Sequence, residues 1–372
     1  MNEFLHIVCL DAPAPPNYGG AIDMFYKIKA LSKSGRKVIL HYYDYRKKRG
    51  VEALRSYCHS IYCYKRKSFL QSLSHSLPYI VSSRINSQLI HRLNRDEHPV
   101  LLEGLHCSGI IPYINNKRRS IVIRVHNNEA DYYHHLAKSE KSFFKKIFFK
   151  RESRMLHTWQ MAMDKNITLA CLSESDAAEL SAVFGFRSVH FIPCFIPWQK
   201  IASKSGLGTY CLYHGNMGVS ENENAARWLA DHVFAHLDIP FIVAGRSLSE
   251  KLKSTMAGYK NISVIKDPPE PQLNALIENA HVHVLPSFNN TGVKLKLLHA
   301  LVNGRFCLTN EAGIDGSKTA DVVLVARIAQ EYRDVISRLM STPFTLADIE
   351  ARNQVLSLYS NEGNAQKFNA LL

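Results

Sequence analysis

The chain has 372 residues, of which 46% are hydrophobic, and its formal net charge at pH 7 is +14. This length exceeds one ordinary domain and suits two, each with its own core. The sequence has no apolar run of about 18 residues, the length of a membrane-spanning helix, and its first residues lack the basic start of a secretory signal. We therefore expect a cytoplasmic protein. The charge leaves nucleic acid, anionic lipid and phosphorylated substrates open as partners.

The eight cysteines include no C-x-x-C pair, and several stand inside apolar runs. This pattern is typical of buried thiols in a reducing compartment. Cys58, His59 and Cys63 resemble part of a metal-ligand set, but no fourth ligand follows at a suitable spacing. We expect no metal site.

In the first half of the chain, short apolar runs alternate with segments of helical periodicity. The expected strands cover 4–10, 37–43, 100–102, 121–125, 167–172 and 189–192. The expected helices cover 21–34, 88–93, 141–163 and 174–183. Residues 193–208 contain prolines, glycines and polar residues, a composition that indicates an interdomain linker.

The alternation restarts after this linker. Strands are expected at 210–213, 241–244, 262–265, 281–285 and 306–309, and helices at 222–236, 248–256, 271–279 and 293–302, with two more helical stretches to follow. The pattern predicts an α/β fold of two doubly wound, Rossmann-like domains with parallel sheets, over 1–195 and 196–372. The final helix of the chain could also pack back on the N-terminal domain.

Ligands of such folds bind beyond the carboxyl ends of the strands, so we searched the segments that follow strands. Gly19 and Gly20 precede the first expected helix, where backbone N–H groups can cradle a phosphate. A flexible connector is the alternative. His126 and Asn127 follow the strand at 121–125, so His126 is expected to face a ligand, whereas Asn127 or Asn128 is expected as the cap of the next helix.

Glu103 and His106 follow the strand at 100–102 and have a similar placement. In the second half, Gly215 and Asn216 form a glycine-containing turn before a helix, and Arg246 follows the next strand. Ordinary turns with solvated side chains would explain these residues equally well.

The segment after the strand at 281–285 contains Ser287 and Gly292 and then Lys294 and Lys296, at the start of a helix. Cations are unfavourable at a helix N-terminus, so two lysines there indicate a bound anion such as a diphosphate. Ordinary exposed lysines are the alternative.

These segments together resemble a known family. The stretch 284–310, with Pro286-Ser287, Gly292, Lys294-Leu295-Lys296 and Gly304-Arg305, is similar to the donor-site segment of GT-B fold glycosyltransferases of the large retaining group 1, or family four, type. That family includes bacterial mannosyltransferases and sucrose synthase. Residues 213–228 are similar to its Gly-x-Met segment and the helix that follows, residues 18–20 to its N-terminal glycine loop, and 124–127 to the place of its active-site histidine.

The resemblance implies that a nucleotide diphosphate sugar binds in a cleft between two facing domains, with no cofactor and no metal. It implies transfer of a hexosyl unit, with retention, to a glycan or lipid-linked acceptor of bacterial polysaccharide synthesis. His126, Lys294 and Lys296 are then catalytic. Gly19, Gly20, Gly215, Asn216, Arg246, Ser287, Thr291, Gly292 and His299 bind the donor, and Glu103, His106 and Asn127 lie on the acceptor side.

The chain departs from the family at two positions. The family has two glutamates eight positions apart in the donor segment, and these positions are Thr291 and His299 here. The second glutamate normally holds the donor ribose. A catalytically weak or silent binding subunit of a glycan-synthesis machinery is therefore the alternative function.

In residues 141–154, Phe143, Phe144, Ile147 and Phe148 lie at helical spacing among six lysines and arginines. This pattern is typical of an amphipathic helix on an anionic membrane surface, which would place the protein at the inner face of the plasma membrane. A helix with its phenylalanines in the core is equally compatible. No aromatic-interleaved basic stripe or known module supports nucleic-acid binding. A dinucleotide enzyme would need G-x-G-x-x-G after the first strand, which is absent.

Overall fold

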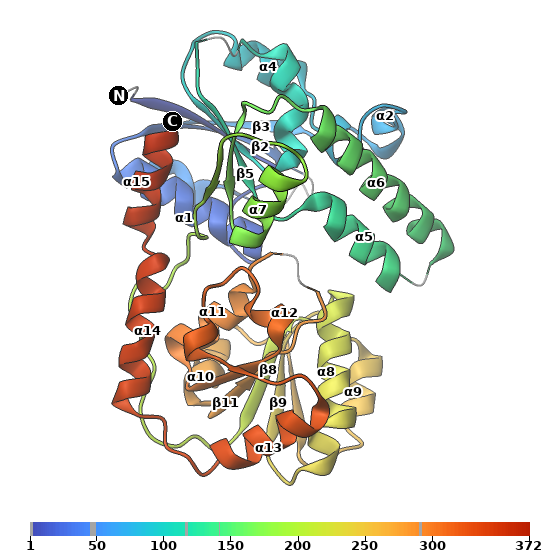
Figure 1. The fold of residues 1–372 in the computed structure, drawn as a ribbon, viewed down its shortest axis with the longest axis vertical. Coiled ribbons are helices and arrows are strands. Elements are labelled where there is room, and N and C mark those ends of the chain that lie inside the picture. Colours follow the sequence, from blue (N-terminus) through green and yellow to red (C-terminus); the bar gives the residue numbers. More distant parts are fainter. Residues whose placement is uncertain (1–2, 45–49, 116–117, 141, 290–291) are drawn as a thin grey trace. The chain divides into compact units, whose positions relative to one another are not determined.

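The computed structural model describes residues 3–44, 50–115, 118–140, 142–289 and 292–372. It divides into two compact units (Figure 1). Unit 1 comprises Met1–Pro197 and Tyr359–Leu372, and unit 2 comprises Trp198–Leu358. The boundary lies two residues after the one expected. The last helix belongs to unit 1, the arrangement that the sequence left open.

In the described part of unit 1, seven parallel strands form one sheet, in the order β3-β2-β1-β4-β5-β6-β7. The strands are β1 (Phe4–Cys9), β2 (Lys37–Asp44), β3 (Cys58–Lys65), β4 (Val100–Glu103), β5 (Ile121–Val125), β6 (Thr168–Cys171) and β7 (Val189–Phe191). The sequence did not predict β3. Its pairing with β2 is irregular at the start, because the register shifts between Val38, opposite Cys58, and Ile39, opposite Ser60.

Helices cover both faces of this sheet, because successive residues of a buried strand point to opposite sides. Leu5 and Ile7 of β1 pack with Met24 and Ile28, whereas Val8 belongs to a second core cluster. The helices are α1 (Gly19–Lys33), α2 (Phe69–Ser72), α3 (Tyr79–Ser82), α4 (Ser87–Leu93), α5 (Glu129–Ser139), α6 (Phe143–Ala162), α7 (Glu174–Ala182) and α15 (Asn361–Leu371), with 3₁₀ turns η1 (Glu52–Tyr57) and η2 (Leu105–Tyr113).

Local sequence signals set several helix ends in both units. The side chains of Asn86, Ser173 and Ser249 accept hydrogen bonds from backbone N–H groups at the starts of α4, α7 and α9 (Glu250–Met256). Gly35 follows α1 with φ of +99°, a conformation that glycine adopts without strain.

In the described part of unit 2, six parallel strands form a second sheet, in the order β10-β9-β8-β11-β12-β13. They are β8 (Cys211–Asn216), β9 (Phe241–Arg246), β10 (Ile262–Lys266), β11 (Val282–Val284), β12 (Phe306–Thr309) and β13 (Leu324–Val325). Around them lie α8 (Ser220–His232), α9, α10 (Glu270–Asn279), α11 (Leu295–Asn303), α12 (Glu311–Ile314), α13 (Ala329–Leu339) and α14 (Leu346–Leu358), with η3 (Phe234–His236) and η4 (Ala320–Val322). The expected α/β fold class is confirmed.

Each sheet has a point where the strand order reverses. In unit 1 it lies between β1 and β4, and in unit 2 between β8 and β11. Open parallel sheets bind ligands at such points, beyond the carboxyl ends of the strands. No helix in the described residues is long and apolar enough to cross a membrane.

Candidate functional site

At the reversal point of unit 1, Glu103 and His126 contact each other. Glu103 is the last residue of β4 rather than part of the following loop, and His126 directly follows β5. The imidazole Nε2 lies 3.0 Å from Glu103 Oε2, and both side chains are buried. The structure thus joins one residue predicted to be catalytic with one predicted to lie on the acceptor side.

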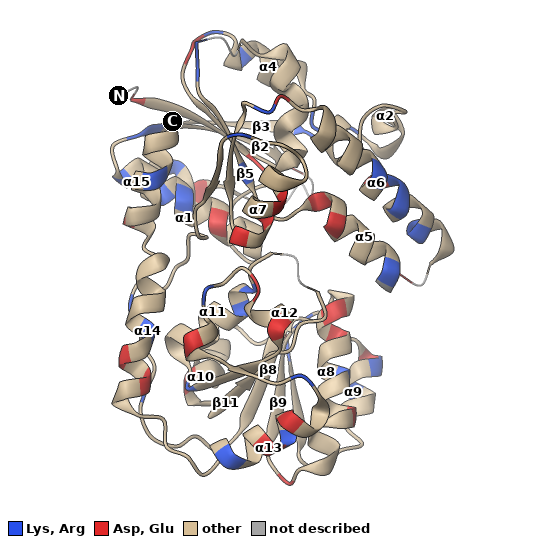
Figure 2. Cartoon of the chain, in the orientation of Figure 1, with Lys and Arg blue, Asp and Glu red and all other residues tan. Residues whose placement is uncertain are grey.

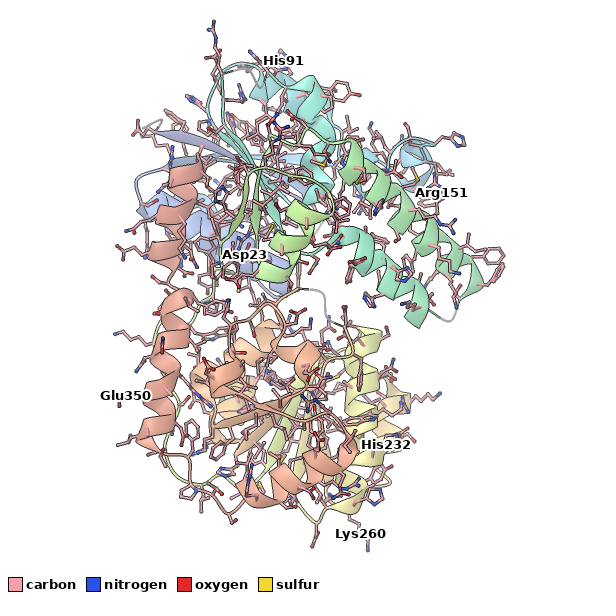
Figure 3. All side chains as sticks on the ribbon, viewed as in Figure 1. Asp23, His91, Arg151, His232, Lys260 and Glu350 are labelled. Carbon is pink, nitrogen blue, oxygen red and sulfur yellow. The ribbon has the colours of Figure 1, made fainter. Side chains whose placement is uncertain are left out.

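Two charged residues of α1 extend this contact. Lys27 Nζ lies 2.9 Å from Glu103 Oε1 and 2.7 Å from Asp23 Oδ2. Asp23, labelled in Figure 3, also accepts hydrogen bonds from the guanidinium of Arg124 and, at 2.8 Å, from the backbone N–H of Phe195. We call Asp23, Lys27, Glu103, Arg124 and His126 the buried charge cluster.

The charges in this cluster stabilise one another. Burial by itself raises the pKa of Asp23, but Arg124 and Lys27 reverse the effect and hold it below its ordinary value. Burial also raises the pKa of Glu103, and Lys27 and the hydrogen bond from His126 bring it below its ordinary value. Both carboxyl groups are therefore ionised at neutral pH.

Half-buried His106 and buried Glu129 form a second pair in unit 1. His106 Nδ1 is 3.9 Å from Glu129 Oε1, in the first turn of α5. Burial raises the pKa of Glu129 to about 8, so this carboxyl group is largely protonated at neutral pH. Burial and the nearby Arg84 lower the pKa of His106 well below its ordinary value. His106 and Glu129, which could both hydrogen-bond to an acceptor substrate, are thus both uncharged at neutral pH.

In unit 1, one expectation is corrected and one open alternative is decided. Gly19 and Gly20 do not precede the first helix but form its first turn, after Tyr18, whose side chain does not cap it. Of the two asparagines expected as the helix cap, Asn128 caps α5, because its Oδ1 accepts a hydrogen bond from the Ala130 N–H at 3.2 Å. Asn127 is half-buried.

At the reversal point of unit 2, the Lys296 ammonium group is held by two residues. Nζ donates to the Tyr213 hydroxyl at 3.0 Å and to Asn222 Oδ1 at 2.9 Å. It also lies 4.6 Å from the centre of the Tyr213 ring, within cation–π range. Burial lowers the pKa of Lys296 to about 8. Because this pKa is close to neutral pH, both the charged and the neutral form of the Lys296 amine are accessible.

Ser287 connects the strand ends around this lysine. Its backbone N–H donates to Asn310 Oδ1 at 2.9 Å, and its hydroxyl donates to Glu221 Oε1 at 2.7 Å. Glu221 lies in the first turn of α8, where a carboxylate is favoured by the helix dipole, and its charge acts on Lys296. A carboxylate that the sequence did not single out thus lies beside the predicted donor site.

Lys294 and Lys296 have different surroundings. Lys294 precedes α11 as its N-cap, and its Nζ donates to the Gly292 carbonyl at 2.9 Å, whereas Lys296 reaches Tyr213. The helix starts at Leu295 rather than at Gly292, which has φ of +68°. Thr291 lies outside the described residues.

Gly215, Asn216 and Arg246 lie within strand ends rather than in the loops expected. Gly215 and Asn216 pair with Gly245 and Arg246 across β8 and β9. Asn216 shapes the next turn, because its Oδ1 accepts from the Gly218 N–H at 3.0 Å and its carbonyl from Asn222 at 2.9 Å. The Arg246 side chain is exposed at the same edge of the sheet. His299 lies in α11 and stacks on Trp198.

A known protein family matches most of unit 2. The family described as "Glycosyl transferases group 1" matches residues 208–342, which include β8, Ser287 and Lys296. The protein is a glycosyltransferase. An uncharacterized 44.6 kDa protein in the cps region of Klebsiella pneumoniae is similar to it, with 26% identity over 364 residues that cover 91% of this chain and 93% of the relative.

Solved structures with the same architecture are similar over nearly their whole length. Sucrose-phosphate synthase from Thermosynechococcus elongatus has a TM-score of 0.74 at 14% identity, over 99% of this glycosyltransferase and 98% of the synthase. HepE from Anabaena, solved with UDP and glucose, has a TM-score of 0.59 at 10% identity, over 98% and 95% of the two chains. The fold of the glycosyltransferase is GT-B, as the sequence predicted.

The sequence analysis missed Asp23 and Lys27 in unit 1 and Glu221 and Asn222 in unit 2. A signal for the first two was present: they stand four residues apart within the apolar pattern of the first helix, where unpaired charges are costly. Glu221 and Asn222 lie in a helix start of ordinary composition, and only the fold brings them to Ser287 and Lys296.

Proposed function

We propose that this glycosyltransferase moves a hexosyl unit from a nucleoside diphosphate sugar to a hydroxyl group of a glycan or lipid-linked acceptor in polysaccharide synthesis. The observation that carries the proposal is the Lys296 ammonium group at the reversal point of unit 2, within the matched family segment. The Klebsiella relative, whose description places it in a cps region, supports the polysaccharide assignment.

Lys296 places a positive charge beside the leaving diphosphate, which gains negative charge during transfer. Transfer breaks the bond between the anomeric carbon and the diphosphate oxygen, so negative charge develops on the leaving group. A partly desolvated ammonium group interacts with that charge more strongly than a solvated one. In this proposal Lys294, Gly292 and Arg246 also contact the phosphates, Gly215, Asn216, Ser287 and His299 contact the nucleotide or sugar, and the reaction proceeds with retention and without a metal.

In unit 1, we assign the hydroxyl chemistry to His126. Its imidazole sits where β5 ends, beside Glu103, and hydrogen-bonds a sugar or acceptor hydroxyl. Gly19 and Gly20 offer the uncapped first turn of α1 to a phosphate, and His106 and Asn127 are half-buried groups for the acceptor.

Thermal stabilisation by nucleotides, in the presence of EDTA, tests the donor assignment. A ligand that binds only the folded state raises the melting temperature with its affinity. UDP is the first probe, because the HepE relative was solved with it, and GDP, ADP and CMP are compared with it. We expect selective stabilisation by one diphosphate, reduced in Lys296→Met and retained in Lys260→Met, whose lysine is exposed on unit 2. No stabilisation by any of the four would contradict the donor assignment.

The role of His126 is tested on the same protein. We expect His126→Ala to abolish transfer of sugar from the donor identified in this way while UDP still stabilises the protein, because unit 2 carries the nucleotide contacts. Wild-type turnover in this variant would show that His126 is not a residue of the active site.

For the acceptor, we propose that α6 and α2 together bind an anionic membrane surface at the cytoplasmic face. Phe143 and Phe144 of α6 are 69% and 82% exposed, and Leu70 of α2 is 80% exposed. The ring centroids of Phe69 and Phe148 are 5.7 Å apart, so the two helices meet. Phe148 and Phe149 are half-buried and contact Tyr79 and Tyr133, whereas Phe143 and Phe144 are exposed, so the alternative with this face of the helix in the core does not apply to Phe143 and Phe144.

The charge of this surface matches anionic lipid. Figure 2 shows basic residues along α6. A pocket of about 480 Å³ beside Ile147 is lined by His75, Lys150, Arg151 and Arg154. The acidic residue in this stretch, Glu152, is buried and accepts a hydrogen bond from the Tyr79 N–H at 3.0 Å. Lys141 lies outside the described residues.

Vesicle flotation tests the membrane proposal. We expect the protein to float with vesicles that contain phosphatidylglycerol and not with neutral vesicles, since each basic residue near an anionic surface contributes about 1 kcal/mol. Phe143→Ser with Phe144→Ser should weaken flotation, and Leu346→Ser, at a residue 74% exposed on unit 2, should not. Equal flotation of both variants would contradict the proposal.

A further inference from the structure

The buried charge cluster contains the donor atoms of a metal site but supplies its own cation. One ligand atom each of Asp23, Glu103 and His126 lie within 4.8 Å of one another, an arrangement that resembles a metal-binding set. The Lys27 ammonium group, however, lies 2.7 Å from Asp23 and 2.9 Å from Glu103. A second cation beside this ammonium would be repelled by it.

The charges of the cluster balance only when His126 is neutral. Asp23 and Glu103 contribute two negative charges, and Lys27 and Arg124 contribute two positive charges. An unbalanced charge at this depth is strongly unfavourable. A protonated His126 would add a third positive charge, so the balance favours the neutral imidazole.

The hydrogen bond to Glu103 then decides which nitrogen carries the proton. An ionised carboxylate only accepts hydrogen bonds, so Nε2 must be the N–H donor of the pair. In a neutral ring the other nitrogen, Nδ1, is an acceptor. Within the described residues Nδ1 forms no hydrogen bond, and it is not among the fully enclosed polar atoms. It is the ring atom left for a ligand.

We propose that Lys27 and Glu103 are positioning residues that hold His126 as the neutral Nε2–H tautomer, with Nδ1 directed to accept a hydrogen bond from a substrate hydroxyl. Lys27 keeps Glu103 ionised and fixed, and Glu103 orients the ring. Only the identity of the hydroxyl rests on the proposed function. The tautomer follows from the cluster itself.

Other charged and titratable groups around His126 are also part of this environment. They are Asp23 and Lys27 from α1, Arg84 after α3, Glu103 from β4, His106 from η2 and Arg124 from β5. Asp23 is paired with Lys27 and Arg124, and the Arg84 guanidinium donates to the carbonyls of Leu10 and Ile80. Glu103 is the carboxylate that contacts the imidazole directly.

Nitrogen-15 NMR of the full chain, labelled at histidine and assigned with His126→Ala, tests the proposal without any substrate. We expect an unprotonated Nδ1 and a protonated Nε2 at pH 7.5. Glu103→Gln should increase the fraction of the Nδ1–H tautomer, because a neutral amide no longer requires Nε2 to be the donor. Lys27→Met should act in the same direction, because it removes the group that holds the Glu103 carboxylate in place. An Nδ1–H tautomer of the wild type at pH 7.5, or an unchanged tautomer in both variants, would overturn the proposal.

The controls separate positioning from folding. Glu152→Gln changes another buried carboxyl group of unit 1 that pairs with backbone N–H groups, and should leave the His126 signals unchanged. If a single variant fails to fold, the double variant Lys27→Met with Glu103→Gln preserves the charge balance, and it should lose the tautomer preference. A double variant with the wild-type tautomer would overturn the proposal.

Kinetics then connect the tautomer to transfer. With an active donor and acceptor, we expect Glu103→Gln to reduce kcat by roughly 100-fold with a smaller effect on KM, since a misoriented imidazole mainly affects the transition state. The predicted tautomer in a protein that binds none of the nucleotides would contradict the proposed function and leave the positioning role in place. An active enzyme whose His126 is the Nδ1–H tautomer would support the proposed function and overturn the positioning role.

Discussion

The rings of Trp198 and His299 stack, with centroids 4.2 Å apart and planes 18° apart. Burial lowers the pKa of His299 to about 4, so the ring is neutral at physiological pH and stacks as an uncharged aromatic group. The resemblance to the family places a ribose-binding glutamate at this position. Here the side chain at that position already contacts a neighbour of its own unit.

We expect His299→Ala to lower the free energy of unfolding by about 1 kcal/mol or more, because the stacked contact with Trp198 is lost. Urea denaturation measures this change. Isothermal titration of the same variant with UDP tests the donor role expected from the sequence. Weaker UDP binding at unchanged stability would show that the stack is not the main role of the ring.

We expect the affinity for UDP to fall as the pH rises above about 8, the pKa to which burial lowers Lys296. The ammonium form predominates below that pH and attracts the diphosphate. Above it the amine is neutral, and binding must take up a proton, which weakens affinity by up to about tenfold per pH unit. Titration calorimetry from pH 6.5 to 9.5 measures the effect. Lys296→Met should bind weakly with no such slope, and a wild-type slope in this variant would point to another group.

We expect Gly245→Ala to destabilise the protein by roughly 2–4 kcal/mol. A Cβ atom at this position would lie 1.9 Å from the Gly215 carbonyl oxygen, which belongs to the neighbouring strand of the sheet and cannot move freely. At Gly258, the nearest heavy atom to a Cβ is the Thr255 carbonyl oxygen at 3.4 Å, an ordinary contact. Chemical denaturation of both alanine variants should show a large loss only for the first.

We expect Glu129→Gln to be more stable than the wild type at pH 8, by on the order of 2 kcal/mol. Burial raises the folded-state pKa of Glu129 to about 8, so the folded state holds this proton more tightly than the unfolded chain. The resulting stability is fully present below the unfolded pKa of about 4.3 and is lost as the pH rises through about 8.

Unfolding free energies between pH 5 and pH 8.5 test this sign. The advantage of the glutamine variant should shrink toward pH 5, where the wild-type carboxyl group is protonated. Glu270→Gln, at an exposed residue of α10, is the matched control and should show no such trend. A constant difference at every pH would contradict a raised pKa at Glu129.

The sequence by itself determined the architecture and the places where functional groups gather. Apolar runs of strand length alternate with amphipathic segments, and this local pattern is enough to indicate parallel sheets with helices on both faces. Because ligands of such sheets bind at the strand ends, chain order alone led to His126 and Lys296. The pattern failed for β3, an edge strand, and for strand ends such as Asn216 and Arg246, since polar residues there look like loop.

Only the tertiary structure decided which side chains meet and in what state of charge. Asp23 and Glu103 are 80 residues apart in the sequence, and both reach Lys27 because α1 packs where β4 ends. The pKa of Lys296 and that of Glu129 depend on burial, a property of the assembled fold rather than of residue spacing. Desolvation and charge pairing act through space, so the chemistry of His126 and Lys296 is set by neighbours that the linear sequence does not place beside them.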